Sequence, residues 1–261
     1  MNGLISVTGV ILARAGSKRI KLKNLRLVAG KPLVLWTIEA ALASRSLSRL
    51  IVSTDDSLVA EIAGKAGAEV PFARPPELAT DFVPSIDVVL HAAAWEAETQ
   101  RGGSDYMMCL HATSPLRTPD DIDRSIDLAQ AKHADSVIGV SQADVTNHPL
   151  RALRSRENGT IASWIENDLE RAMGQELPQA LRPNGAILLG RTSFLTVSRG
   201  WIGERTYPFI MPAERSVDID SELDLRIAEL LLTSRETIAL AAHIPSHTPE
   251  RTASRIRNVR I

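Results

Sequence analysis

Short apolar runs alternate with segments of helical spacing along the first half of the chain. These apolar runs are typical of buried strands. The first stands before Gly16, and the others lie at 49–54, 68–72, 106–110 and within 135–140. Between them, apolar positions recur every three or four residues in segments that begin near Pro32, at Asp55 or Asp56, at Ser85 and at Thr118. These residue types suit a helix cap or a first turn. The alternation predicts an α/β fold with a doubly wound, mostly parallel sheet.

The alternation stops in the segment 141–184, which we interpret as an inserted subdomain that forms a dimer contact or a lid. Within it, the dipeptide Asn158-Gly159 is typical of a hairpin turn. Strand-like runs return at 185–190 and 206–211, and a helix with one apolar stripe follows the segment 216–220. We therefore expect a core formed by 1–140 and 185–235, the insert 141–184, and a C-terminal tail, 236–261, without assigned chemistry.

The composition argues against several classes of protein. The 261 residues contain 30 Lys and Arg against 31 Asp and Glu, which disfavours a dedicated nucleic-acid binder. The single cysteine, Cys109, excludes an internal disulfide framework and a zinc cluster of thiolates. The start of the chain does not resemble a signal peptide, and no apolar run approaches the ~20 residues of a membrane helix. We expect a cytoplasmic protein without nucleic-acid or membrane partners.

Positive charge is concentrated in the loop that follows the first predicted strand. The segment ILARAGSKRIKLKN, 11–24, contains five cations, and no acidic residue precedes Glu39. The cations are Arg14, Lys18, Arg19, Lys21 and Lys23. A basic, glycine-containing loop at this place in an open α/β sheet is typical of polyphosphate binding, because backbone N–H groups at Gly16 can approach phosphate oxygens. The alternatives are a solvated basic loop or a nucleic-acid patch.

A pair of carboxylates near the end of the predicted core suits a metal ion. Asp218 and Asp220 stand two residues apart, so both project to the same face of an extended segment. Mg²⁺ bridges such carboxylates to substrate phosphates. The alternative is that Asp220 only caps the helix that begins near Ser221. The chain lacks a Walker lysine motif, a G-x-G-x-x-G after the first strand and a G-x-S-x-G, which disfavours P-loop, dinucleotide and serine-hydrolase sites.

Several segments, taken in order, resemble the acylneuraminate cytidylyltransferases, also called CMP-sialic acid synthetases. They are ILARAGSKRIKLKN, IVSTDD (51–56), RPPELATD (74–81), ATSPLR (112–117), LPQALRPNGAI (177–187) and SVDIDSELDL (216–225). The resemblance extends from about residue 7 to about residue 232. It implies a fold of the nucleotide-diphospho-sugar transferase type with an inserted dimerisation subdomain. It also implies that CTP is joined to a nine-carbon sugar acid, with Mg²⁺ as cofactor, pyrophosphate as product and a homodimer as the assembly.

The resemblance also implies roles for individual residues. It places nucleotide binding at Leu12, Ala13, Arg14, Gly16, Ser17, Lys18, Lys23 and Asn24, with Arg74 and Ser85 at the cytidine. It places the sugar at His111, Thr113, Ser114, Arg182 and Asn184, together with Arg151 from the partner chain. The magnesium ligands are Asp218 and Asp220.

The expected reaction is nucleotidyl transfer, in which positioning and charge neutralisation dominate. The anomeric hydroxyl of the sugar attacks the α-phosphorus of CTP in line with departing pyrophosphate. The expected catalytic residues are Arg14 and Lys18 at the leaving pyrophosphate, Lys23 at the α-phosphate and Asp220 at the metal. The sequence offers no convincing general base, so we expect a metal-bound or solvent route for the proton.

Two departures from the family pattern concern the sugar. His111 stands where relatives commonly have Gln, and Gly174 stands where they commonly have Arg, which removes a bidentate anion contact. The chief alternative is therefore a guanylyl- or cytidylyltransferase acting on a different sugar, such as a hexosamine 1-phosphate. Further alternatives are a glycosyltransferase that uses Asp218-x-Asp220 to bind a metal–nucleotide-sugar, and a non-enzymatic nucleotide sensor.

Overall fold

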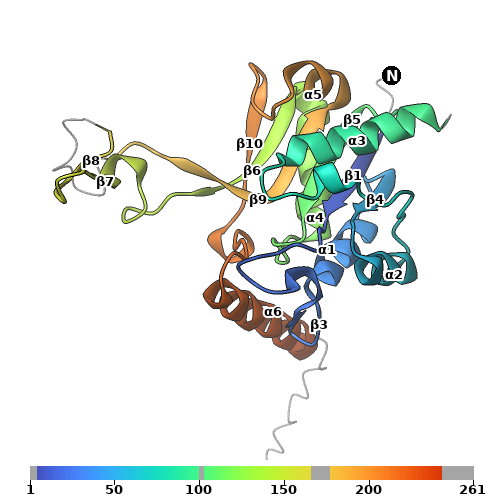
Figure 1. Cartoon of the computed structure of the whole chain (residues 1–261), viewed down its shortest axis with the longest axis horizontal. Coiled ribbons are helices and arrows are strands. Elements are labelled where there is room, and N and C mark those ends of the chain that lie inside the picture. The colour runs from blue at the N-terminus through green and yellow to red at the C-terminus, as the bar shows by residue number, and fades with distance from the viewer. Residues whose placement is uncertain (1–4, 100–102, 166–176, 243–261) are drawn as a thin grey trace, which may run out of the picture.

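The centre of the molecule is a six-stranded sheet in the order β10-β6-β9-β5-β1-β4 (Figure 1). The computed structural model describes residues 5–99, 103–165 and 177–242. In sheet order the strands span Thr206–Ile210, Ser136–Gln142, Leu181–Arg191, Tyr106–His111, Val7–Leu12 and Arg49–Ser53. β9 runs antiparallel to both β5 and β6, and the other pairs are parallel, so the predicted mostly parallel sheet is confirmed.

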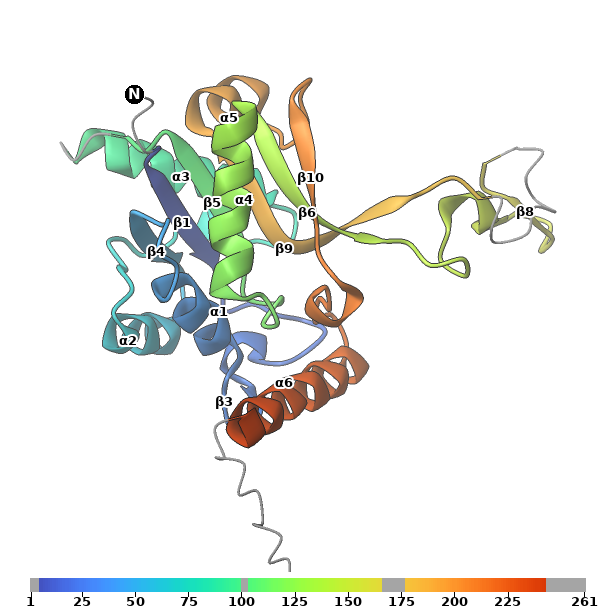
Figure 2. The ribbon, with the colours of Figure 1, turned by 180° about the vertical axis from the view of Figure 1, so that it is seen from behind.

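Helices cover both faces of the sheet (Figures 1 and 2). α1 (Leu33–Leu42), α2 (Ser57–Ala66) and α4 (Pro119–Lys132) contribute to one apolar cluster, and α3 (Ser85–Glu98) and α5 (Thr192–Ser198) contribute to another. The neighbouring β1 residues Val10 and Ile11 belong to different clusters, as the alternation of side chains along a strand requires. Burial of apolar surface on both faces therefore holds β1, and the loop after it, in place.

Helices follow Asp56 and Thr118 and begin at Ser85 as predicted, but only two of these three residues are the predicted caps. Asp56 caps α2, where its carboxylate accepts two backbone N–H groups of the first turn. Thr118 forms a capping box with Asp121 at the start of α4. Ser85 is not a cap, because the residue before it holds that position, and the Ser85 hydroxyl instead accepts the indole N–H of Trp201 at 3.3 Å.

The predicted strand at 68–72 is also wrong. Glu69 and Ala73 form only isolated parallel bridges, to Ile51 and Thr54. Pro71 lies between them and has no N–H to donate. The segment therefore follows β4 at the edge of the sheet without forming a continuous ladder.

The connection between β6 and β9 leaves the body of the molecule (Figure 1). We call its described residues, 143–165 and 177–180, the arm. At its far end β7 (Leu153–Ser155) and β8 (Ile161–Ser163) form an antiparallel hairpin. The predicted turn residue Gly159 has a φ of +80°, which favours glycine. β6 and β9 extend into the predicted insert at both ends, so the arm is shorter than 141–184.

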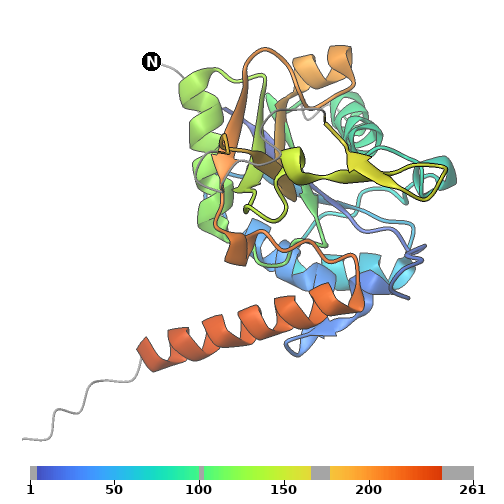
Figure 3. The same cartoon turned by 90° about the vertical axis from the view of Figure 1, so that its left-hand side faces the viewer.

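The last helix, α6 (Glu222–Ala242), packs beside the small hairpin of β2 (Leu27–Val28) and β3 (Lys31–Pro32) in an apolar cluster (Figure 3). α6 continues past the predicted boundary at residue 235, so the predicted tail begins as helix, and 243–261 lie outside the described residues. None of the helices in the described ranges combines the length and apolarity that a membrane crossing needs.

Candidate active site

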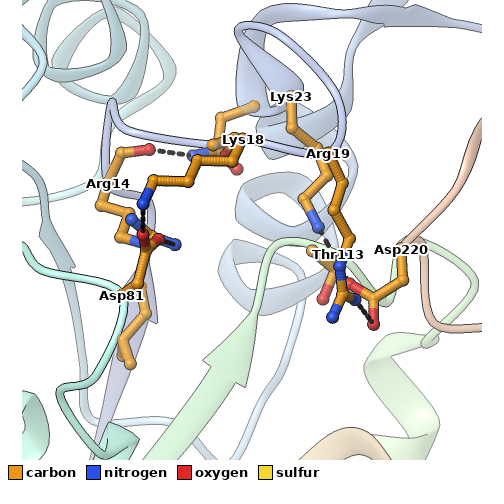
Figure 4. A pocket seen from close by; sticks show the side chains of 10 residues that line it. Arg14, Lys18, Arg19, Lys23, Asp81, Thr113 and Asp220 are labelled. Atoms are coloured by element: carbon orange, nitrogen blue, oxygen red, sulfur yellow. Dashed lines mark hydrogen bonds and ion pairs between the residues drawn. The ribbon is translucent and has the colours of Figure 1, made fainter.

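The basic loop after β1 lines a polar cavity of about 430 Å³ at the carboxyl edge of the sheet, which we call the loop cavity (Figure 4). Its lining comes from four separate parts of the chain: Leu12, Arg14, Ser17, Lys18, Arg19, Lys23, Asn24, Asp81, Thr113 and Asp220. Most of the predicted nucleotide residues, one predicted sugar residue and one predicted metal ligand therefore share a cavity. Ala13, which is buried, and Gly16, which is exposed, belong to the same loop without lining it.

Hydrogen bonds from neighbouring segments fix the conformation of the basic loop. The buried Asn24 donates from Nδ2 to the carbonyl of Arg14 at 2.9 Å. The N–H of Ala15 donates to Oδ1 of Asp55, just beyond β4, at 2.8 Å. Asn24 and Asp55 thus hold the backbone from which the Arg14 side chain enters the cavity.

Two buried isoleucines explain why segments distant in sequence meet at this cavity. Ile20 is 1% exposed and Ile219 is fully buried, and both belong to one apolar cluster with residues of α6. The N–H of Ile219 also donates to the carbonyl of Thr113 at 2.8 Å. Burial of the two isoleucines brings their charged neighbours, Arg19 and Asp220, into contact at the surface.

Asp220 faces the basic loop rather than the helix that follows it. Its carboxylate pairs with Arg19 at 2.8 Å and with Lys23 at 3.4 Å. At the start of α6 the backbone N–H of Ser221 is instead bound by Oδ2 of Asp224, at 2.7 Å. The interpretation of Asp220 as the helix cap is therefore wrong, and its carboxylate belongs to the loop cavity.

Asp81 forms ion pairs with the other two lining cations. Its carboxylate lies 2.5 Å from Arg14 and 2.5 Å from Lys18 (Figure 4). Hydrogen bonds from Lys18 and Arg14 hold the pKa of Asp81 below its ordinary value. Arg14 also donates to the carbonyl of Gly16 at 3.0 Å. In this structure, Gly16 therefore contacts a lining residue through its carbonyl oxygen.

Arg74 and Ser85, the predicted cytidine contacts, line a smaller cavity of about 200 Å³. It shares three lining residues with the loop cavity: Leu12, Arg14 and Asp81. Arg74 is 4% exposed and donates from Nε to the hydroxyl of Ser53 at 3.1 Å and from Nη2 to its carbonyl. Burial lowers the pKa of Arg74 to about 10, which still leaves the guanidinium charged at neutral pH. The three shared residues place the two cavities side by side.

The predicted sugar residues are spread over three cavities. Thr113 lines the loop cavity and His111 lines the one beside Arg74. Arg182 lines a third cavity, of about 440 Å³, together with Asp218 and the start of α6. This third cavity lies where the arm joins β9, and Arg182 is exposed there.

Two of the predicted sugar residues serve the fold. Asn184 is 3% exposed, its Nδ2 donates to the hydroxyl of Ser216 at 2.9 Å, and its Oδ1 accepts the N–H of Ala186 at 3.0 Å. Ser114 is fully buried and donates to the carbonyl of Asn184 at 3.5 Å. Asn184 borders the third cavity, but both ends of its amide are committed within the protein. Its contact with a sugar stays a prediction.

Gly185 lies between His111, which lines the cavity beside Arg74, and Asp218, which lines the third cavity. Its φ is +70°, and a Cβ there would lie 3.2 Å from Nδ1 of His111, 3.4 Å from the Ser114 hydroxyl and 3.7 Å from a carboxylate oxygen of Asp218. These three side chains therefore converge on a stretch of backbone that has no side chain of its own. Burial lowers the pKa of His111, although Asp218 opposes the shift, so the imidazole is neutral at neutral pH.

The two predicted magnesium ligands fit an ion that arrives with a nucleotide. Asp218 and Asp220 are exposed on either side of the buried Ile219, as expected for an extended segment. Within the described ranges, no group of three or more His, Cys, Asp or Glu residues is gathered to hold a metal. Mg²⁺ needs only one or two protein carboxylates when phosphates and waters complete its shell. The donor set therefore suits Mg²⁺ bound jointly with substrate, provided that Asp220 gives up its ion pairs.

Some residues of the site could not be assigned from the sequence. Arg19 is one of five loop cations, with no feature to set it apart, and Asp81 reaches the loop from 67 residues away. Arg117 is buried and donates two hydrogen bonds to backbone carbonyls. One accepts at 3.0 Å and belongs to His111 at the end of β5, and the other accepts at 2.6 Å and belongs to Ala186 in β9. Arg151 lies on the arm, and Gly174 lies outside the described residues.

Comparison with known proteins identifies relatives that match most of the chain. A family model described as cytidylyltransferase matches residues 8–162. The chain is 32% identical over 227 residues to CMP-N,N'-diacetyllegionaminic acid synthase of Legionella pneumophila, covering 87% of this chain and 96% of that protein. It is 30% identical over 229 residues to pseudaminic acid cytidylyltransferase of Campylobacter jejuni, covering 85% and 94%. N-acylneuraminate cytidylyltransferase of Escherichia coli is 30% identical over 223 residues, which is 85% of this chain but about half (51%) of that protein.

Solved structures share the fold at much lower identity. CMP:2-keto-3-deoxy-manno-octonic acid synthetase, complexed with CTP, superposes with a TM-score of 0.66 at 17% identity, covering 88% of this chain and 99% of that chain. 4-Diphosphocytidyl-2C-methyl-D-erythritol synthase from Anaerococcus prevotii superposes with a TM-score of 0.58 at 9% identity, covering 88% and 96%. These likenesses confirm the predicted type of α/β fold.

Proposed function

Because the chain belongs to the cytidylyltransferase family, we propose that it joins CTP to a nonulosonic acid and releases pyrophosphate. The three relatives are named for legionaminic, pseudaminic and acylneuraminic acids and all for CMP synthesis or cytidylyl transfer. They agree on the nucleotide and differ in the acid, so they support CTP more strongly than any one sugar. The proposed reaction consumes CTP, and we place it in the cytoplasm.

One observation carries this proposal: the loop cavity is built for a polyanion. Four cations line it against two carboxylates, which leaves two positive charges in excess. The cations come from a single loop at the carboxyl end of β1, held by Asn24 and Asp55 before any ligand binds. Fixed positive charge in a cleft attracts and orients a triphosphate, and it costs little reorganisation during reaction.

We assign different parts of the triphosphate to different cations. Arg14 and Lys18, on one side of the cavity, would bind the pyrophosphate that leaves (Figure 4). Lys23, on the other side, is 13% exposed at its side chain and donates to the carbonyl of Ile219 at 2.7 Å, so its ammonium is fixed close to Asp220. There it would stabilise charge at the α-phosphate as the sugar oxygen bonds to phosphorus and the bond to the bridging oxygen breaks.

Asp218 and Asp220 would hold Mg²⁺ together with the nucleotide. When bound, the ion supplies positive charge at the phosphate oxygens and lowers the pKa of a coordinated hydroxyl. Release of Asp220 from Arg19 and Lys23 would free both of these cations for phosphate. The neutral His111 beside Gly185 would accept a hydrogen bond from a ligand hydroxyl.

We also propose that the arm contacts a second copy of the chain. Large apolar residues are exposed in its hairpin and directly after it: Leu153 is 56% exposed, Ile161 is 65% exposed and Trp164 is 64% exposed. The hairpin extends away from the body, so the core of the same chain does not cover them (Figures 1 and 2). A symmetric dimer would bury them. Sedimentation equilibrium should show a dimer that dissociates in a double Ile161→Ser, Trp164→Ser variant; a monomeric wild-type protein would contradict this.

A substrate panel tests the proposed reaction. Purified protein with Mg²⁺ is given each nucleoside triphosphate in turn with neuraminic, legionaminic and pseudaminic acids and with hexosamine 1-phosphates, and pyrophosphate release is measured. We expect release with CTP and at least one nonulosonic acid, abolished when either is omitted. Pyrophosphate release only with a hexosamine 1-phosphate, or only with another triphosphate, would show that the proposed substrates are wrong. Binding of CTP without turnover would favour a nucleotide sensor.

A further inference from the structure

Asp81 places a negative charge in a cavity that otherwise suits a polyanion. Its Oδ1 lies 2.5 Å from Arg14 and its Oδ2 lies 2.5 Å from Lys18. Each carboxylate oxygen therefore binds one of the two cations that we assign to the leaving pyrophosphate, as two oxygens of a phosphate would (Figure 4). A carboxylate and a phosphate cannot occupy this place together, because both carry negative charge and both need the same two donors.

The loop that carries Asp81 is built to move without disturbing the core. None of residues 75–85, all of which the structure describes, is buried, and the side chain of Phe82 is 93% exposed. The flanking residues Arg74 and Ile86 are both buried, so they mark the fixed ends of the loop. A shift of Asp81 out of the cavity therefore breaks two partly exposed ion pairs and exposes little apolar surface.

We propose that Asp81 occupies the place of the terminal phosphates when no nucleotide is bound, and that the triphosphate binds by displacing it. This inference rests on the proposed function. Asp81 then weakens the binding of every ligand that carries the β- and γ-phosphates, since only the fraction of molecules with free cations is competent to bind. It also assists release of pyrophosphate, because the carboxylate regains Arg14 and Lys18 as the product leaves.

Protonation does not provide another route to free the cations at neutral pH. Lys18 and Arg14 hold the pKa of Asp81 below its ordinary value, so the carboxylate stays ionised there. Displacement by a competing anion is the remaining route. Because the pairs are partly exposed, added salt should weaken them and reduce the effect of Asp81 on ligand binding.

Isothermal titration calorimetry, carried out in the absence of sugar acid, tests the role of Asp81 in nucleotide binding. Asp81→Asn keeps the shape of the side chain and removes its charge, and CTP, inorganic pyrophosphate and CMP are titrated into the wild-type and variant proteins at low salt. We expect CTP and pyrophosphate to bind about three- to tenfold more tightly to the variant, because two partly exposed ion pairs no longer compete, and CMP to bind with unchanged affinity. Asp81→Glu should remain close to wild type.

A matched control separates this effect from a change in overall charge. Glu61→Gln removes one carboxylate from an exposed ion pair with Lys65 on α2, away from the loop cavity, and should leave all three affinities unchanged. Should Asp81→Asn fail to fold, Asp81→Ser removes the same charge and is measured in its place. A gain in affinity cannot result from a damaged fold.

The possible results distinguish this inference from the proposed function. If the wild-type protein binds CTP and pyrophosphate but the Asp81→Asn protein binds them no more tightly, the proposed function stands and the role given to Asp81 is wrong. Equal tightening of CMP would also overturn it, because CMP lacks the phosphates that Asp81 is said to replace. If the wild-type protein binds neither CTP nor pyrophosphate, the proposed function fails and this inference fails with it.

Discussion

The nucleotide side and the sugar side of the carboxyl edge differ in how much of a site one chain supplies. On the nucleotide side, four cations and two carboxylates from separate segments meet in one cavity, with ion pairs of 2.5 to 3.4 Å. On the sugar side, His111, Thr113 and Arg182 line three different cavities, and Asn184 is tied into the fold. Under the proposed function, the groups for the nucleotide are gathered in one cavity of a single chain, whereas the predicted sugar residues are not gathered in one cavity.

The largest effect is expected from Lys23 on the nucleotide side. Lys23→Ala should lower kcat about 10²–10³-fold, because it removes a fixed charge beside the α-phosphate. Steady-state pyrophosphate release measures this. Lys21→Ala, on the same loop but outside the lining of the loop cavity, is the control and should change kcat little. Equal losses in the two variants would mean that only the overall charge of the loop matters.

On the sugar side, Asn184 and Arg182 should separate stability from binding. Asn184→Ala should lower the free energy of unfolding by about 1–3 kcal/mol, because it leaves the buried N–H of Ala186 without its acceptor. Arg182→Ala should leave unfolding by urea unchanged, since Arg182 is exposed, and raise the KM for the sugar acid. The reverse pattern would show that Asn184 is the sugar contact.

Gly185 tests whether the cavity lined by His111 and the third cavity, lined by Asp218, belong to one site. Gly185→Ala should destabilise the protein by about 1 kcal/mol through its positive φ and raise the KM for the sugar acid, because the methyl group enters the space among His111, Ser114 and Asp218. Gly30→Ala is the matched control, since Gly30 has a φ of +82° with nothing within 4 Å of a Cβ. It should show the loss of stability without the change in KM.

Much of the fold and of the nucleotide side could be predicted from the sequence, because local patterns encode them. Apolar spacing identifies β1, β5 and most helices, and the capping box at Thr118 is a local feature. The segment at 68–72 misled the prediction because its short apolar run is strand-like, while Pro71 prevents a continuous ladder.

Contacts across long stretches of sequence could not be predicted in the same way. Asp81 meets Arg14 because the loop before α3 folds back over the end of β1, and nothing in the spacing of the two residues encodes that. Asn184 has the chemistry of a sugar ligand, and only its contacts with Ser216 and Ala186 show that its amide is already used. Tertiary contacts decide which polar residues remain available to a ligand.

The smallest effect is expected at Cys109, in the strand between the two sides. The thiol is fully buried, and burial raises its pKa from 9.0 to about 12. The native protein should therefore resist alkylation at pH 8, while the unfolded protein reacts. Above pH 9 the unfolded thiol ionises and the folded one does not, so the free energy of unfolding should decrease between about pH 9 and 12. Rapid alkylation of the native protein would contradict the burial of β5.

A crystal structure of the protein with Mg²⁺ and a non-hydrolysable CTP analogue tests the central claim most directly. The account predicts the β- and γ-phosphates at Arg14 and Lys18, the α-phosphate at Lys23, and the ion held by Asp218 and Asp220. A triphosphate bound outside the loop cavity, or both aspartates turned away from it, would contradict the account.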